Sequence, residues 1–172
     1  MANRIYNALF ICTANSARSI MAEALMNHLG AGRVRAYSAG SHPRGTVNPF
    51  ALRTLAAMGL PTDGYRSKSW DEFGDEVGDE LGKPGAPSLD FVFTVCDQAA
   101  GESCPFWPGQ PTTAHWGVPD PAAVTGSDEV KAKAFYDTAV LLKRRIELML
   151  ALPLRTLDAV SLKREVEAIG KR

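Results

Sequence analysis

Eight residues near the start of the chain place a thiol, a guanidinium and small polar residues at a spacing suited to oxyanion chemistry. Cys12 is followed six positions later by Arg18 and then by Ser19. A short loop that enters a helix aims successive backbone N–H groups at one point, where the helix dipole adds positive potential. Arg18 can grip two oxygens of an anion bound there. The expected oxyanion-binding residues are Thr13, Ala14, Asn15, Ser16, Ala17 and Arg18.

The same pattern makes Cys12 a candidate nucleophile. The positive field that binds an anion also stabilises a thiolate, so we expect Cys12 to ionise near neutral pH. The hydroxyl of Ser19 can donate to that thiolate, and the side chain of Asn15 can shape the loop through hydrogen bonds to its backbone. A cysteine and an arginine at this spacing occur by chance, and a buried inert thiol is the alternative. The position between a strand and a helix makes the motif specific.

The elements around this loop predict an α/β domain. Apolar, β-prone runs and helical patterns alternate: strands at 4–11, 33–38, 89–95 and 114–116, and helices ending at Leu29, from Pro49 to Met58, from Ser127 to Leu152, and around Val166. This alternation predicts an open, mainly parallel sheet, whose ligands bind at the carboxyl ends of the strands. Cys12 and Cys96 both fall at such ends.

Length and charge narrow the class of protein. The 172 residues suit one domain, and 19 Lys and Arg balance 19 Asp and Glu, which argues against nucleic-acid binding. There is no apolar run of about 18 residues and no secretion signal, so we expect a cytoplasmic protein with no membrane partner. We divide the chain into a domain at 1–152, with a Gly-rich acidic surface insertion at 71–87, and a helical extension at 153–172.

Several segments resemble the low-molecular-weight tyrosine phosphatase family and, within it, the arsenate reductases reduced by thioredoxin-like partners. The segments lie between Tyr6 and Ala122 and include FICTANSARSIMAEAL, YSAGSHPRGTVNPFA, FVFTVCD and AHWGVPDPA. The resemblance implies a single-domain, three-layer α/β fold with a four-stranded parallel sheet and helices on both faces.

The resemblance also implies a mechanism. Asp120 would be the general acid, which an oxygen leaving with a proton requires. Cys12 would attack arsenate, Cys96 would then attack Cys12, and Cys104 would attack Cys96, so that arsenate becomes arsenite. The resulting Cys96–Cys104 disulfide would be presented to an external reductant, either thioredoxin or glutaredoxin with glutathione. The expected substrate is arsenate, with phosphate as its analogue, in arsenic detoxification, and no bound cofactor or metal is expected.

Three alternatives stay open. A tyrosine or aryl phosphatase working through a cysteinyl-phosphate would need only Cys12, although residues 41–44 lack the aromatic side chains that ring a phosphotyrosine pocket in this family. A non-catalytic oxyanion sensor could keep the loop without Asp120. Cys96 and Cys104 could instead form part of a zinc site with His115, although they lack the close spacing of structural zinc ligands.

Two departures from the family pattern carry expectations of their own. Ala14 replaces a common loop glycine and would be strained if the position needs a positive φ. Lys68 stands where some family members place an acid that helps to hold a potassium ion. Its ammonium could take the place of that ion beside Asn15, Glu23 and Ser38.

Overall fold

The structure, a computed structural model, describes residues 4–73, 87–96, 107 and 110–172. Its four strands, all paired in parallel, are β1 (Tyr6–Cys12), β2 (Val34–Gly40), β3 (Phe91–Thr94) and β4 (Thr112–His115), in the spatial order β2-β1-β3-β4. The helices are α1 (Arg18–Leu29), α2 (Pro49–Ala57), α4 (Asp128–Leu150) and α5 (Ala159–Ile169), with short 3-10 turns η1 (Trp70–Glu72) and η2 (Pro121–Ala123). The expected α/β fold with a four-stranded parallel sheet is confirmed.

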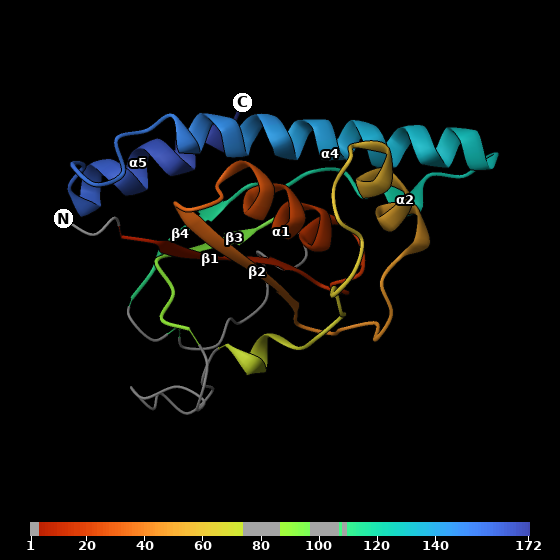
Figure 1. Ribbon diagram of the computed structural model, residues 1–172, viewed down its shortest axis with the longest axis horizontal. Coiled ribbons are helices and arrows are strands. Elements are labelled where there is room, and N and C mark those ends of the chain that lie inside the picture. The colour runs from red at the N-terminus through yellow and green to blue at the C-terminus, as the bar shows by residue number, and fades with distance from the viewer. Residues whose placement is uncertain (1–3, 74–86, 97–106, 108–109) are drawn as a thin grey trace.

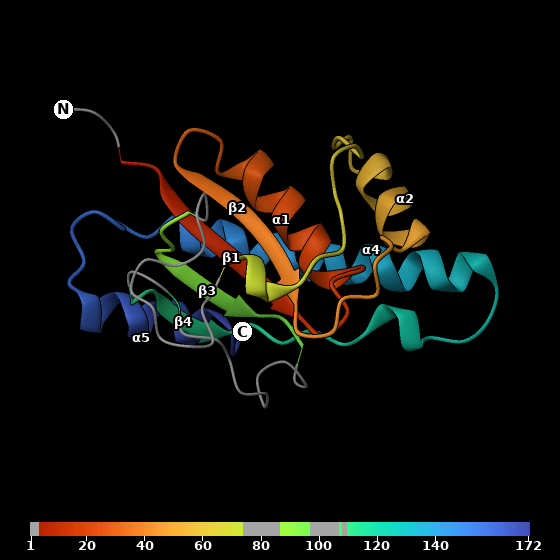
Figure 2. The same ribbon diagram turned by 90° about the horizontal axis from the view of Figure 1, so that it is seen from below.

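Among the described residues, the α-helices lie over one face of the sheet and the short turn η1 lies over the other (Figures 1 and 2). One face meets α1, because Ser38 on β2 donates a hydrogen bond to Glu23 of α1, and α4 packs against α1 on the same side (Figure 1). The other face meets η1: the Tyr37 ring of β2 packs against the tilted ring of Phe73, with ring centroids 5.6 Å apart. A sheet buried on both faces explains why β1 reads as a nearly continuous apolar run.

The connection between β2 and β3 is only partly described. Residues 71–73, the start of the expected surface insertion, complete η1 and bury the Phe73 ring, and residues 74–86 lie outside the described part. Phe73 is therefore an apolar anchor that the Gly-rich, acidic composition of 71–87 concealed.

The C-terminal helix packs on the edge strand. Val166 and Ile169 of α5 are buried, and the indole N–H of Trp116 donates to the carbonyl oxygen of Val166 at 2.9 Å. Gly170 lies so close to β4 that a Cβ there would fall 2.2 Å from the carbonyl oxygen of His115. Residues of the expected 153–172 extension thus contribute to the core beside β4.

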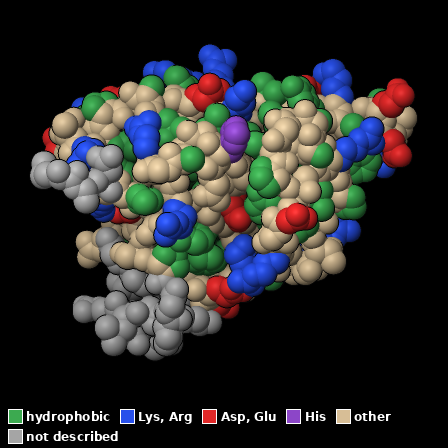
Figure 3. Space-filling view, viewed as in Figure 1, with side chains coloured by type: hydrophobic (Ala, Val, Ile, Leu, Met, Phe, Trp, Pro, Cys, Tyr) green, Lys and Arg blue, Asp and Glu red, His purple; other side chains and the backbone are tan. Residues whose placement is uncertain are grey.

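Charged side chains of both signs are interspersed on the face shown in Figure 3, in keeping with the net charge of zero. Among the helices of the described residues, none has the length and apolarity needed to cross a bilayer.

Candidate active site

The loop between β1 and α1 is held from outside by its carbonyl oxygens. They accept hydrogen bonds from backbone N–H groups of the segment after β2: Thr13 from His42 (2.9 Å), Ala14 from Arg44 (2.9 Å) and Ser16 from Asn48 (2.8 Å). In a trans peptide the C=O of one residue and the N–H of the next point in opposite directions. The N–H groups of Ala14, Asn15 and Ala17 therefore turn toward the inside of the loop.

The first turn of α1 adds further donors. Ala17 is the residue at the N-cap, and no side chain makes a capping hydrogen bond there. The first N–H groups of a helix have no partner within the helix, and they lie at the positive end of its dipole. The loop and the start of α1 together form the kind of cradle that binds a tetrahedral anion.

Cys12 lies at the base of this loop. Its side chain is almost fully buried, its Sγ is 2.9 Å from Oγ of Ser19, and the N–H of Asn15 donates to the sulfur at 3.2 Å. Burial raises the pKa of the Cys12 thiol, while these hydrogen bonds act in the opposite direction. The expected ionisation near neutral pH thus faces a desolvation cost that the sequence did not reveal.

Asn15 is the residue that shapes the loop. It takes a left-handed conformation with φ of 46°, its side-chain amide donates to Oγ of Ser19 at 2.8 Å, and its Oδ1 accepts the N–H of Lys68 at 2.9 Å. Asparagine tolerates this conformation better than most residues. The strain considered for Ala14 is absent, because the positive φ falls at Asn15 and not at Ala14.

Arg18 and Asp120 meet at the mouth of the loop. Arg18 Nη1 donates to the carbonyl oxygen of Val118 at 3.1 Å, and Nη2 lies 3.8 Å from Oδ2 of Asp120. Asp120 caps η2, its Oδ1 accepting the N–H of Ala122 at 3.0 Å, and its side chain is 45% exposed. The carboxyl group therefore lies beside the Arg18 guanidinium group and is open to solvent.

Cys96 brings a second thiol to the same edge of the sheet. It follows β3, the neighbour of β1, and its Sγ lies 3.5 Å from Oγ1 of Thr13. Cys12 and Cys96 are both buried thiols that are not joined in a disulfide. Cys104, the third member of the expected relay, lies outside the described residues.

Lys68 lies with the three residues expected beside it. Its Nζ is 3.8 Å from Oε1 of Glu23, and the Ser38 hydroxyl donates to that same oxygen at 2.5 Å. Burial raises the pKa of Glu23 and lowers the pKa of Lys68, and the attraction between the two charges opposes both shifts. The ammonium group thus faces a buried carboxylate behind the loop.

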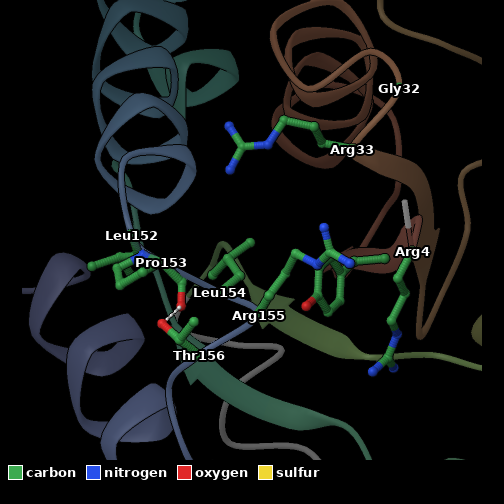
Figure 4. A pocket seen from close by; sticks show the side chains of 9 residues that line it. Arg4, Gly32, Arg33, Leu152, Pro153, Leu154, Arg155 and Thr156 are labelled. Atoms are coloured by element: carbon green, nitrogen blue, oxygen red, sulfur yellow. Dashed lines mark hydrogen bonds between the residues drawn. The ribbon is translucent and has the colours of Figure 1, made fainter. Parts of the chain in front are cut away.

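Two cavities of the described structure lie away from this loop. The larger, of about 400 Å³, is lined by Arg4, Arg33 and Arg155 around an apolar floor that includes 152–154 (Figure 4). The other, of about 340 Å³, shares Arg4 and Tyr6. Both open at the start of β1, roughly 20 Å along the strand from Cys12. Among the described residues no group of three or more His, Cys, Asp or Glu is arranged to hold a metal.

Two residues that lie near the site, Gly40 and Arg145, were not identified from the sequence. Gly40 ends β2 directly behind the loop, where a Cβ would lie 2.5 Å from the carbonyl oxygen of Thr13. Arg145 reaches from α4 to the chain that precedes Asp120. The available signal for Arg145 was its helical spacing, three residues after Leu142 and four before Met149 on the apolar stripe of α4.

Comparisons with known proteins agree with this geometry. The low molecular weight phosphotyrosine protein phosphatase family matches residues 7–167. An arsenate reductase of Shouchella clausii (strain KSM-K16) is 32% identical over 126 residues, which cover 73% of this chain and 81% of the relative. A thioredoxin-dependent arsenate reductase of Corynebacterium glutamicum is 25% identical with a TM-score of 0.56, covering 86% of this chain and 65% of that one. An arsenate reductase solved in the phosphate-binding state shares the fold at 24% identity and a TM-score of 0.62, covering 85% and 97%. This chain belongs to the low molecular weight phosphotyrosine protein phosphatase family, and within it to the group of the arsenate reductases.

Proposed function

We propose that this protein reduces arsenate to arsenite for arsenic detoxification, with Cys12 as the nucleophile. The observation that carries the proposal is the second buried thiol: Cys96 lies at the same sheet edge, its Sγ 3.5 Å from Oγ1 of Thr13. A phosphatase completes its cycle with one thiol and water, whereas a reductase must supply two electrons. Two relatives, from Shouchella clausii and Bacillus subtilis, are arsenate reductases that are 32% and 31% identical to this chain.

The first step forms a bond between sulfur and arsenic. The Cys12 thiolate attacks the arsenic atom of an anion held by the loop N–H groups and by Arg18. One arsenate hydroxyl leaves as water with the proton that Asp120 donates. Ser19 favours the thiolate through its hydrogen bond to Sγ, which offsets part of the cost of burial.

The next two steps move electrons along the thiols. The Cys96 thiolate attacks Sγ of Cys12, a disulfide forms, and the sulfur–arsenic bond breaks with its electron pair kept by arsenic, so As(V) becomes As(III) and leaves as arsenite. The Cys104 thiolate then attacks Sγ of Cys96 and releases the Cys12 thiolate. The role of Cys104 rests on the family resemblance.

The Cys96–Cys104 disulfide must then be reduced by an external thiol. Thioredoxin is the favoured partner, since a similar enzyme of Corynebacterium glutamicum is named as thioredoxin-dependent. Glutaredoxin with glutathione is the other candidate, and it could bypass Cys104. A relay that starts from three thiols requires a reducing compartment, which makes the cytoplasm the proposed location.

A low-molecular-weight protein tyrosine or aryl phosphatase is the second candidate. The cradle, the nucleophile and the acid would serve thiol attack on phosphorus as well as on arsenic, and the matched family is named for phosphatases. In that reaction Cys96 and Cys104 would have no role.

One assay separates these candidates. The reduced protein is incubated with arsenate, thioredoxin, thioredoxin reductase and NADPH, and NADPH loss is followed beside hydrolysis of p-nitrophenyl phosphate. We expect arsenate-dependent NADPH oxidation that is lost in Cys12→Ser and in Cys96→Ser. Cys104→Ser should lose multiple turnover with thioredoxin and keep any phosphatase activity, and a glutaredoxin system tests whether Cys104 can be bypassed.

Two results would reject the proposal. Rapid hydrolysis of p-nitrophenyl phosphate without arsenate-dependent NADPH oxidation would identify the protein as a phosphatase. Arsenate binding without either activity would make it an oxyanion sensor. Asp120→Asn provides the control for catalysis, because loss of a general acid slows a reaction by about 10²- to 10⁴-fold.

A further inference from the structure

Arg145 is a buried cation on the apolar face of α4. Its side chain shares that face with Leu142, Ile146 and Met149, and the residue is 6% exposed. Among the described residues no Asp or Glu side chain lies within ion-pair distance of it, and burial lowers its pKa. A buried charge is costly unless it is well hydrogen-bonded, so the hydrogen bonds of Arg145 decide whether the site is tolerated.

Those hydrogen bonds go to main-chain oxygen atoms, two of which are the successive peptide carbonyls of Trp116 and Gly117. Nη1 donates to Trp116 at 2.8 Å and to Gly117 at 2.9 Å, and Nη2 reaches Arg172 at 3.4 Å, while Nε has no partner among the described residues. A guanidinium presents several donors in a fixed plane, so one nitrogen can hold two successive carbonyl groups. Arg145 therefore fixes the direction of the chain as it leaves β4.

The chain that it fixes is the one that carries Asp120. The carbonyl of Val118, the next residue, accepts from Arg18, and the N–H of Val118 donates to Val95 at 3.1 Å. Three successive carbonyl groups, at 116, 117 and 118, are thus held by two guanidinium groups. Arg145 holds the inner two from behind, and Arg18 holds the outer one from the anion-binding loop. Asp120 follows two residues later.

We infer that Arg145 is a positioning residue that places the Asp120 carboxyl group over the oxyanion loop, an inference that rests on the proposed reaction. Arg145 contacts neither the anion site nor Asp120 and acts through the backbone at 116–118. Its loss leaves two carbonyl groups without their donor and lets the acid shift. A displacement of about 1 Å at a reacting group can cost about 10²-fold in rate.

The test is a double-mutant cycle on single turnover. The reduced full-length protein is mixed with arsenate without external reductant, and arsenite formation is timed. We expect Arg145→Met to slow the reaction about 10- to 100-fold. In an Asp120→Asn background the same change should slow it by less than about twofold, because the acid it positions is already gone. In Arg145→Met, the phosphate concentration that halves the rate should change by less than about twofold, since the loop between β1 and α1 is held by other contacts.

Arg144→Met is the matched control, because Arg144 is the exposed neighbour of Arg145 on α4. It should leave both the rate and phosphate inhibition unchanged. If Arg145→Met does not fold, Arg145→Lys replaces it in both backgrounds. The inference is overturned if Arg145→Met slows the reaction equally in the unaltered protein and in the Asp120→Asn background. It is also overturned if Asp120→Asn alone is as fast as the unaltered protein. If the unaltered protein forms no arsenite, the result rejects the proposed function and not the role of Arg145 alone.

Discussion

At the scale of single residues, Glu23 and Lys68 form a buried pair of opposite charges behind the loop between β1 and α1. Their side chains are 14% and 9% exposed. Glu23 has its pKa raised by burial, and the Ser38 hydroxyl and the Lys68 ammonium both oppose that rise. The Lys68 backbone also donates to Asn15, which links this pair to the loop. We therefore expect Lys68 to supply internally the cation that this place requires.

Replacing Lys68 with Met should destabilise the protein in a pH-dependent way. Without the ammonium, the folded-state pKa of Glu23 lies further above its unfolded value. Such a carboxyl group favours folding below its unfolded pKa, and this contribution is lost as the pH rises toward the folded pKa. In urea unfolding, we expect the free energy of unfolding to fall by about 2 kcal/mol near pH 8 and by less near pH 5. The loss is smaller than for a buried pair in direct contact, because the two charged atoms are 3.8 Å apart.

Lys133→Met is the control, because Lys133 and Asp137 form an exposed pair on α4. Its loss should cost about 0.3–0.5 kcal/mol. Potassium chloride, compared with sodium chloride at the same ionic strength, should leave the stability and activity of the unaltered protein unchanged. A marked rise with potassium would show that Lys68 does not take the place of the ion.

At the scale of elements, the end of β2 sets the shape of the loop between β1 and α1. Gly40 pairs with Cys12 across the strands, and its missing side chain lets the loop carbonyl of Thr13 and the Asn15 backbone approach. A Cβ would lie 2.5 Å from the former and 3.0 Å from the latter, and both contacts are with backbone that cannot move without moving the loop. The strand and the loop are thus fitted to each other at this position.

Gly40→Ala should therefore weaken anion binding together with stability. Overpacking of this kind costs about 1–3 kcal/mol, and the displaced loop N–H groups should weaken phosphate binding, measured by calorimetry. Gly32→Ala serves as the comparison, because Gly32 is exposed, has a φ of 81° and has nothing within 4 Å of the added Cβ. It should lose about 1 kcal/mol through backbone strain and bind phosphate normally. Equal phosphate affinity in both variants would contradict this role of Gly40.

The elements also show which parts of the site were predictable from the sequence. Alternating strands and helices predicted that Cys12 and Cys96 both lie at carboxyl ends of parallel strands, and the structure adds that these two strands are neighbours. The positive φ of Asn15, the close approach at Gly40 and the reach of Arg145 depend on contacts between residues far apart in the chain. No local pattern encodes such distances, so these features required the structure.

At the scale of the whole molecule, α5 packs the C-terminal segment against β4, the strand that precedes Asp120 in the chain. Val166 is fully buried, its carbonyl oxygen accepts the Trp116 indole N–H, and Trp116 stacks on Phe93 with centroids 4.0 Å apart. Helix α5 has 11 residues, and an isolated helix of that length is marginal in water. Its stability must come from docking, so we expect residues 153–172 to unfold together with the domain at 1–152.

Val166→Ala tests this coupling against a matched change on the same helix. Removing two buried methyl groups should cost about 2 kcal/mol of global stability, whereas Val160→Ala, at a side chain 76% exposed, should cost less than about 0.5 kcal/mol. Tryptophan fluorescence, which includes Trp116, and far-ultraviolet circular dichroism should follow one coincident urea transition in both variants, as a two-state domain requires. If Val166→Ala produced a separate early transition of α5 with the rest of the protein unchanged, the helix would be an appendage. Its contacts with Trp116 would then contribute nothing to holding the chain before Asp120.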